Sequence, residues 1–165
     1  MGYGGRVMKT GCAKWFLKTA AFVLLTASVA KLISAFGATP TLYHNDPITG
    51  LSFDKLFLVV GVVELGSAVL CLSDVIGTCP KLGLVAWLST NFLVYRLGLW
   101  FIGWHRPCGC MGGLAAVFRL SDKTADDIMK GLLAYMLIGS YAGLFWFAKQ
   151  RREVGIGLPP PPAPR

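Results

Sequence analysis

Four long apolar runs, separated by short polar segments, constrain what this chain can fold into. They cover residues 15–36, 55–72, 82–104 and 126–148. Each run is close to the ~20 residues that an α-helix needs to cross ~30 Å of hydrocarbon. Because a chain in lipid must satisfy its own backbone hydrogen bonds, runs of this length are expected to be helices. The sequence therefore predicts an all-α fold, a polytopic transmembrane four-helix bundle.

The composition supports this architecture. Of the 165 residues, 55% are hydrophobic and 15% are charged, and the mean hydropathy is +0.60. Soluble domains usually have roughly 45–50% apolar and about 25% charged residues. The length suits one domain. We expect a cytoplasmic lead at 1–14, a membrane domain at 15–148, and a basic, proline-rich cytoplasmic tail at 149–165.

The net charge of +8 does not indicate nucleic-acid binding. A nucleic-acid site would need the basic residues in one patch, whereas here the Lys and Arg residues flank the apolar runs. Basic residues at the ends of spans set the orientation of a membrane protein. The partner that the sequence predicts is therefore the lipid bilayer, and nucleic acid is excluded.

The first run has a rival interpretation as a signal peptide. Ser28-Val29-Ala30 resembles a cleavage site of the small-residue type. However, the apolar character resumes after Lys31, and the polar segment that follows is short. These two features favour a retained span.

The basic residues also predict which side each loop faces. One side would hold Arg6, Lys9, Lys14, Lys18, Lys81, Lys149, Arg151, Arg152 and Arg165. The other would hold Lys55, Arg106, Arg119, Lys123 and Lys130, together with Asp46, Asp54, Asp122, Asp126 and Asp127. The positive-inside rule then puts both termini in the cytoplasm. In a bacterial inner membrane, the segment after the third span would face the oxidising periplasm.

That outward segment, residues 105–113, contains Cys108-Gly-Cys110. Two thiols separated by one glycine can form a disulfide only if the backbone curls tightly, since their Cα atoms must come within about 7 Å. A strained disulfide of this kind is easily exchanged. Positive charge from His105 and Arg106 would favour the reactive thiolate. We therefore take Cys108 and Cys110 as candidate catalytic residues, with His105 and Arg106 in support.

Two other interpretations of this segment stay open. The cysteine pair could be a static disulfide or a turn built from small residues. His105, Cys108, Cys110 and Met111 are also ligands that suit Cu(I), but a complete site would need more ligands, so copper is the less favoured interpretation and no metal is predicted. The other cysteines lie on the cytoplasmic side and are expected to be reduced and inert: Cys12, Cys71 and Cys79.

Three ionisable residues fall inside the predicted spans: Lys31, Glu64 and Arg96. Such groups are costly in lipid and usually face the bundle interior. At a rise of 1.5 Å per residue, all three lie roughly 8–12 Å below the outer ends of their spans. We expect Glu64 to pair with Lys31 or Arg96. Together these three residues form either a structural ion-pair network or a polar pocket. Such a pocket could hold a quinone head group or serve as a proton path. Tyr95 is expected to point away from its neighbour Arg96.

Two local patterns occur in the last span. The segment Gly139-Ser-Tyr-Ala-Gly143 lets a helix backbone approach another closely, and we expect it to be used within the bundle, with dimerisation as the alternative. Thr124 and Asp127 have the spacing of a helix N-terminal capping box.

Three stretches of the chain resemble the MauE/DoxX-like family of redox-associated membrane proteins. They are Leu-Thr-Ala-Ser-Val-Ala-Lys31-Leu, Val-Val-Gly-Val-Val-Glu64-Leu and Cys108-Gly-Cys110-Met-Gly. Met111 stands where the family has an aromatic or another aliphatic residue. The resemblance covers roughly residues 16–147. It implies a membrane partner of thioredoxin-like periplasmic proteins in which Cys108 and Cys110 exchange disulfides.

The leading hypothesis is a multi-pass inner-membrane protein that supports thiol–disulfide exchange through Cys108 and Cys110. The first alternative is a non-enzymatic scaffold or assembly subunit whose cysteine pair is structural. The second is a quinone-binding subunit or small transporter that uses Lys31, Glu64 and Arg96. Quinone is the one cofactor left open. The partner protein, the electron source and the oligomeric state are not determined by the sequence.

Overall fold

In the computed structural model, four helices account for most of the chain. They are α1 (Gly4–Phe36), α2 (Phe53–Leu72), α3 (Thr78–Phe101) and α5 (Asp122–Ile156). The structure describes the backbone at 4–36, 45–103 and 122–156, and side chains at 11–36, 45–103 and 123–150. Within these ranges the only β-type pairing is one isolated bridge between Asn45 and Ser52. The predicted all-α class is confirmed.

All four helices are long and apolar enough to cross a membrane. The qualifying segments are Gly11–Phe36, Phe53–Leu72, Thr78–Phe101 and Lys123–Gln150. Large apolar side chains cover their outer faces: Phe22, Val62, Trp87 and Ile138 are each more than half exposed. In water such a surface would be unfavourable, whereas in a bilayer it contacts acyl chains. The chain is thus built as a multi-pass membrane protein.

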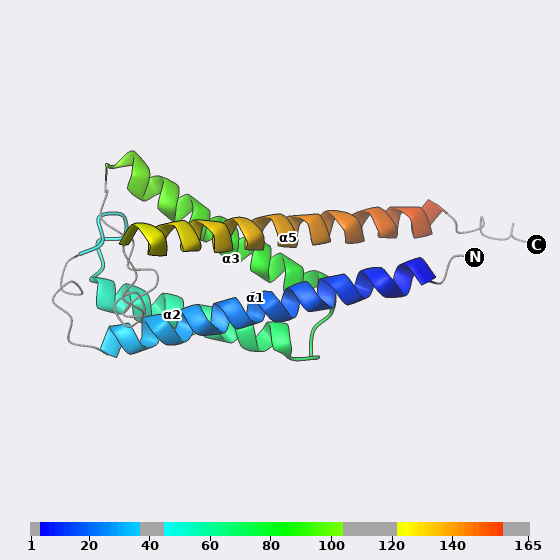
Figure 1. The fold of residues 1–165 in the computed structure, drawn as a ribbon, viewed down its shortest axis with the longest axis horizontal. Coiled ribbons are helices and arrows are strands. Elements are labelled where there is room, and N and C mark those ends of the chain that lie inside the picture. Colours follow the sequence, from blue (N-terminus) through cyan, green and yellow to red (C-terminus); the bar gives the residue numbers. More distant parts are fainter. Residues whose placement is uncertain (1–3, 37–44, 104–121, 157–165) are drawn as a thin grey trace, which may run out of the picture.

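The helices form two antiparallel pairs. Figure 1 shows α1 lying along α2 and α3 crossing α5, and these are also the most extensive helix contacts. The beginning of α1 and the end of α5 lie at one end of the bundle, which we call the terminal end. The end of α3 and the beginning of α5 lie at the other end, which we call the loop end. Residues 104–121, which follow α3 and precede α5 in the sequence, lie outside the described residues.

Small and aliphatic residues let the helices approach near the terminal end. A Cβ at Gly139 of α5 would overlap the ring of Phe16 from α1, and a Cβ at Gly143 would lie 2.9 Å from a methyl of Leu82 in α3. Phe16 and Leu82 both belong to the buried core. The predicted use of the Gly139–Gly143 pattern in packing within the bundle is confirmed.

Specific polar contacts join the helices. The Ser28 hydroxyl donates to the carbonyl of Gly61 at 2.8 Å, and so ties α1 to α2. The hydroxyls of Thr19 and Tyr135 lie 2.7 Å apart and join α1 to α5. In lipid such interhelical bonds contribute roughly 1 kcal/mol each. Ser28, which the sequence also offered as part of a cleavage site, is thus fully buried in a helix contact.

Several helix ends differ from the predicted spans. Helix α3 begins at Thr78, so Pro80 lies in its first turn, where a missing N–H costs little. Lys81 follows, and its ammonium group donates to the carbonyl of Ser73 just past the end of α2. A cation is favourable at a helix C-terminus. The predicted capping role of Thr124 is wrong, because α5 already begins at Asp122 and Thr124 lies inside its first turn.

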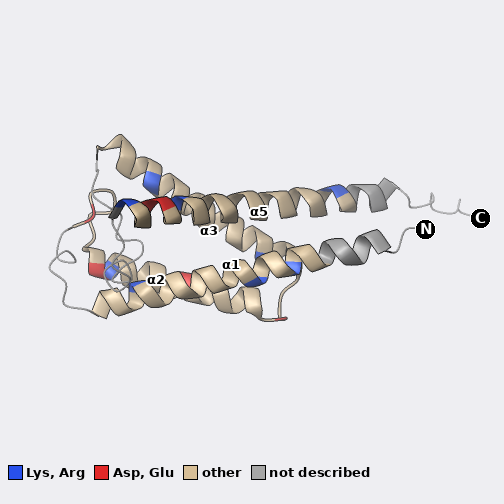
Figure 2. Cartoon of the chain, viewed as in Figure 1, with Lys and Arg blue, Asp and Glu red and all other residues tan. Residues whose placement is uncertain are grey.

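Most of the described acidic residues lie toward the loop end, but Asp74 lies in the link between α2 and α3, toward the terminal end. Figure 2 shows acidic residues at the beginnings of α2 and α5, near the middle of α2 and in the link between α2 and α3, with basic residues toward both ends of the bundle. This distribution follows the charge pattern from which the orientation was predicted. The orientation itself, with both termini in the cytoplasm, stays a prediction.

Candidate functional site: a buried ion pair beside an apolar cavity

Three of the predicted site residues lie within the described structure, on three different helices. Lys31 is on α1, Glu64 on α2 and Arg96 on α3. The other four predicted residues lie outside the described residues: His105, Arg106, Cys108 and Cys110. Met111, the remaining candidate Cu(I) ligand, also lies outside them.

Lys31 and Glu64 form a buried ion pair. The Lys31 Nζ donates to Glu64 Oε1 at 2.5 Å, and the two side chains are only 5% and 2% exposed. Lys31 Nζ also lies 5.4 Å from the centre of the Phe92 ring, where the negative face of the ring attracts a cation. Of the two pairings that the sequence left open for Glu64, the structure contains the one with Lys31.

The pair arises from the close approach of α1 and α2. Gly61 has no side chain, and a Cβ at this position would lie only 3.1 Å from a side-chain carbon of Leu32. The Ser28 hydroxyl also donates to the Gly61 carbonyl. These contacts bring the two backbones together about one helical turn away from the charges. Lys31 and Glu64 then meet across the same interface.

Glu64 has one unsatisfied oxygen. Its Oε2 is buried and has no hydrogen-bond partner among the described residues. An unpaired acceptor on a buried carboxylate is expensive, because it has lost water and gained nothing in return. A hydrogen-bond donor from a bound molecule or an ordered water would satisfy this oxygen.

Arg96 has a different partner. Its guanidinium pairs with Asp126 in the second turn of α5. Asp126 also accepts from Lys130, one turn further along α5, at 2.6 Å. Arg96 is therefore neutralised by α5 and not by Glu64. The sequence analysis placed Asp126 only among the acidic residues of the outer side and missed this long-range contact.

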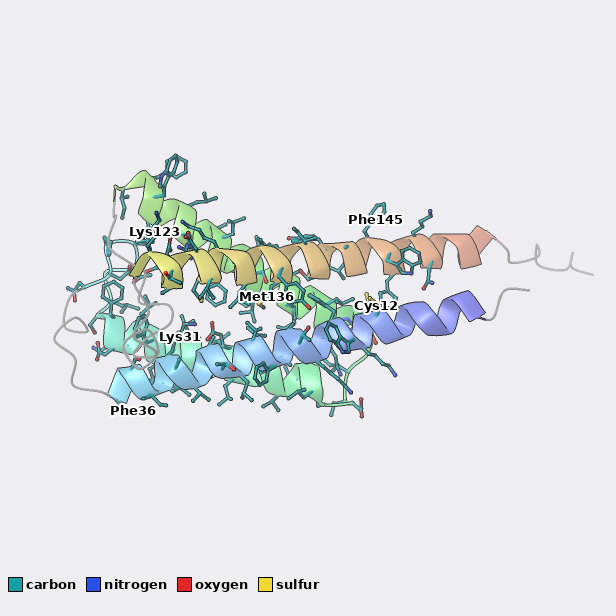
Figure 3. The ribbon with its side chains drawn as sticks, viewed as in Figure 1. Cys12, Lys31, Phe36, Lys123, Met136 and Phe145 are labelled. Atoms are coloured by element: carbon teal, nitrogen blue, oxygen red, sulfur yellow. The ribbon has the colours of Figure 1, made fainter. Side chains whose placement is uncertain are left out.

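An apolar cavity of about 320 Å³ is lined mainly by α1 and α5, with contributions from α2 and α3. The residues that line it include Phe22, Ala27, Lys31, Glu64, Phe92, Tyr95, Arg96, Met129, Leu133 and Met136. In Figure 3, Lys31 and Met136 are seen on α1 and α5 on the sides that face each other. The volume lies within the roughly 300–1,000 Å³ typical of small-molecule sites.

Tyr95 contacts the loop before α2, whereas its neighbour Arg96 pairs with α5. Its hydroxyl donates to Asp46 Oδ1 at 2.7 Å, while the Thr49 amide and hydroxyl donate to Asp46 Oδ2 at 2.8 and 2.6 Å. Burial opposes the charge on Asp46, but these hydrogen bonds outweigh it and lower the pKa of Asp46 below its ordinary value. Asp46 thus anchors the 45–52 loop to α3.

The three remaining cysteines lie apart from this site. Cys71 is buried in the core, where it packs as a small hydrophobic residue. Cys79 is half-buried in the first turn of α3, and Cys12 is exposed on α1 (Figure 3).

The chain matches no protein-family model, and neither the characterised proteins nor the experimentally solved structures include a significant match. The resemblance to the MauE/DoxX-like family stays a prediction.

Proposed function

We propose that the chain is an inner-membrane protein of the MauE/DoxX-like type that exchanges disulfides through Cys108 and Cys110 on the periplasmic side. One observation supports it most. The end of α3 and the beginning of α5, which flank the cysteine segment in the sequence, lie at the loop end of the bundle, opposite the beginning of α1 and the end of α5 (Figure 1). If the basic termini are cytoplasmic, as the positive-inside rule predicts, the end of the bundle at which this segment begins and ends is on the side of the oxidising compartment.

The proposed reaction is a balanced two-electron exchange. The thiolate of one cysteine attacks a disulfide sulfur of a thioredoxin-like partner, and the partner's other sulfur leaves as a thiolate. The second cysteine then attacks the mixed disulfide, which releases the partner as a dithiol and leaves Cys108 joined to Cys110. The partner is reduced by two electrons and the Cys108–Cys110 pair is oxidised by two. The reverse sequence would oxidise the partner.

A redox titration of the purified full-length protein tests this proposal. The protein is equilibrated in glutathione buffers of graded potential, and free thiols are counted with an alkylating mass tag. A variant with Cys12, Cys71 and Cys79 changed to Ser reports on the outward pair alone. We expect a reversible loss of both tags over a narrow range of potential. Changing Cys108 and Cys110 to Ser should remove the transition.

The main alternative is a scaffold with a structural cysteine pair. It predicts a pair that stays oxidised across the whole range of glutathione buffers, since structural disulfides resist reduction by glutathione. It also predicts that the variant without Cys108 and Cys110 still supports assembly of its partners in cells. Either result would contradict the exchange proposal.

A further inference from the structure

The cavity and the ion pair together define a site for a ligand with one polar and one apolar part. Glu64 contributes an acceptor, Oε2, that no described group satisfies. Lys31 contributes an ammonium group whose hydrogen bond to Glu64 Oε1 uses one of its three protons. Both residues line the cavity. A ligand that both donates and accepts, as a hydroxyl group does, would complement this pair.

The walls of the cavity favour an aromatic ring next to that hydroxyl. Phe22 and Phe92 supply aromatic side chains, and Met129 and Met136 supply polarisable sulfur. Ring–ring and sulfur–ring contacts each add roughly 0.5–1.5 kcal/mol to the apolar contacts. A purely aliphatic chain would gain the apolar contacts but not the ring–ring and sulfur–ring terms, and it would leave Glu64 Oε2 unpaired.

The cavity also reaches the membrane-facing surface. Phe22 and Thr26 line it; Phe22 is exposed on the outer face of α1, and Thr26 also reaches the surface. A ligand can therefore enter from the bilayer between α1 and α5, and a long tail can stay among the lipid chains while the ring lies inside. This access suits a lipid-soluble molecule and not a water-soluble one.

We propose that the cavity binds a lipid-soluble hydroquinone, a dihydroxy aromatic ring with an isoprenoid or alkyl tail, with one ring hydroxyl donating to Glu64 Oε2. The oxidised quinone lacks this donor, so the site prefers the reduced form. Cys108 and Cys110 take no part in this binding. The inference therefore goes beyond the proposed exchange activity and does not depend on it.

The test uses the full-length protein in detergent micelles and decylubiquinol as the probe, with binding followed by isothermal titration calorimetry. The matched probe is its dimethyl ether, which keeps the ring and tail but has no hydroxyl donor. We expect decylubiquinol to bind about tenfold or more tightly than the ether, because a hydrogen bond to a charged group is lost. Glu64→Gln should reduce the difference between the two probes.

A second variant covers the case in which Glu64→Gln does not fold. Leu133 lines the cavity, so Leu133→Trp should fill it and abolish saturable binding of decylubiquinol. Leu97→Trp is the matched control, since Leu97 is exposed on α3 and does not line the cavity. The Cys108→Ser, Cys110→Ser double variant should bind the probe as the wild type does, whatever the outcome of the redox titration.

Three results would overturn the inference. Equal affinity for decylubiquinol and its ether would mean that the cavity takes apolar chains, with water on Glu64 Oε2. Equal affinity for dodecanol would remove the requirement for a ring. Unchanged binding by Leu133→Trp would place the probe elsewhere.

Discussion

The two ends of this bundle are assembled by different means. Toward the terminal end, glycines of α5 lie against the side chains of Phe16 and Leu82, and the helices are held together by close apolar packing. Toward the loop end, α1 and α5 are separated by a cavity, and charged side chains make the contacts. The close-packed end serves stability. The open end leaves an unsatisfied carboxylate oxygen and room beside it, which is the arrangement that a binding site needs.

The largest loss of stability is expected from removing one charge of the Lys31–Glu64 pair, toward the loop end. Lys31→Met leaves the Glu64 carboxylate buried without a cation, and removing one partner of a buried pair costs about 3–5 kcal/mol. Unfolding by SDS in mixed micelles measures this loss. The double variant Lys31→Met, Glu64→Leu should recover most of it, because an apolar pair of similar volume needs no counter-charge. No recovery would mean that the cost comes from packing.

A smaller loss of stability is expected from a substitution in the packed contacts toward the terminal end. Gly139→Ala forces the Phe16 ring to move and should cost about 1–3 kcal/mol. Gly131 on the same helix has nothing within 4 Å of a Cβ position, so Gly131→Ala is the control and should be neutral or stabilising. The same unfolding assay compares them. Equal effects of the two variants would contradict the packing contrast between the ends.

The Arg96–Asp126 pair should contribute less to stability than the Lys31–Glu64 pair. The side chains of Arg96 and Asp126 are 19% and 29% exposed, against 5% and 2% for Lys31 and Glu64. Asp126→Asn should therefore cost up to about 1 kcal/mol. Unfolding measured at low and high salt checks this, since a partly exposed pair is screened. A loss as large as that of Lys31→Met would contradict the ranking.

The smallest loss of stability is expected at Asp46 in the 45–52 loop, and it should depend on pH. Because hydrogen bonds lower the pKa of Asp46 in the folded state, its contribution to stability is present at neutral pH and lost as pH falls below the ordinary value of 3.8. The midpoint of thermal unfolding of the wild type should therefore exceed that of Asp46→Asn at pH about 6 and approach it near pH about 3. A difference that stays constant with pH would exclude the carboxylate as its source.

The sequence predicted the spans because hydrocarbon thickness and backbone hydrogen bonding leave little choice. It also predicted that Glu64 has a buried cation as its partner, because an isolated charge is so costly there. It did not predict that Arg96 pairs with Asp126 or that Tyr95 reaches Asp46. Both contacts depend on how α3 crosses α5 and the 45–52 loop. The crossing of helices depends on side-chain packing between them, which local sequence patterns do not predict. The sequence offered a polar pocket at Lys31, Glu64 and Arg96 as one alternative, but it did not predict the mainly apolar lining from α1 and α5, for the same reason.

Thiol trapping of Cys108 and Cys110 in intact cells, with a membrane-impermeant alkylating mass tag, is the decisive test of the exchange proposal. Cys12, Cys71 and Cys79 are first changed to Ser so that only Cys108 and Cys110 report. We expect both thiols to be labelled from outside after mild reduction and to become protected when the medium is made oxidising. Thiols that can be reached only after the membrane is opened, or a pair that is oxidised in every medium, would contradict the proposal.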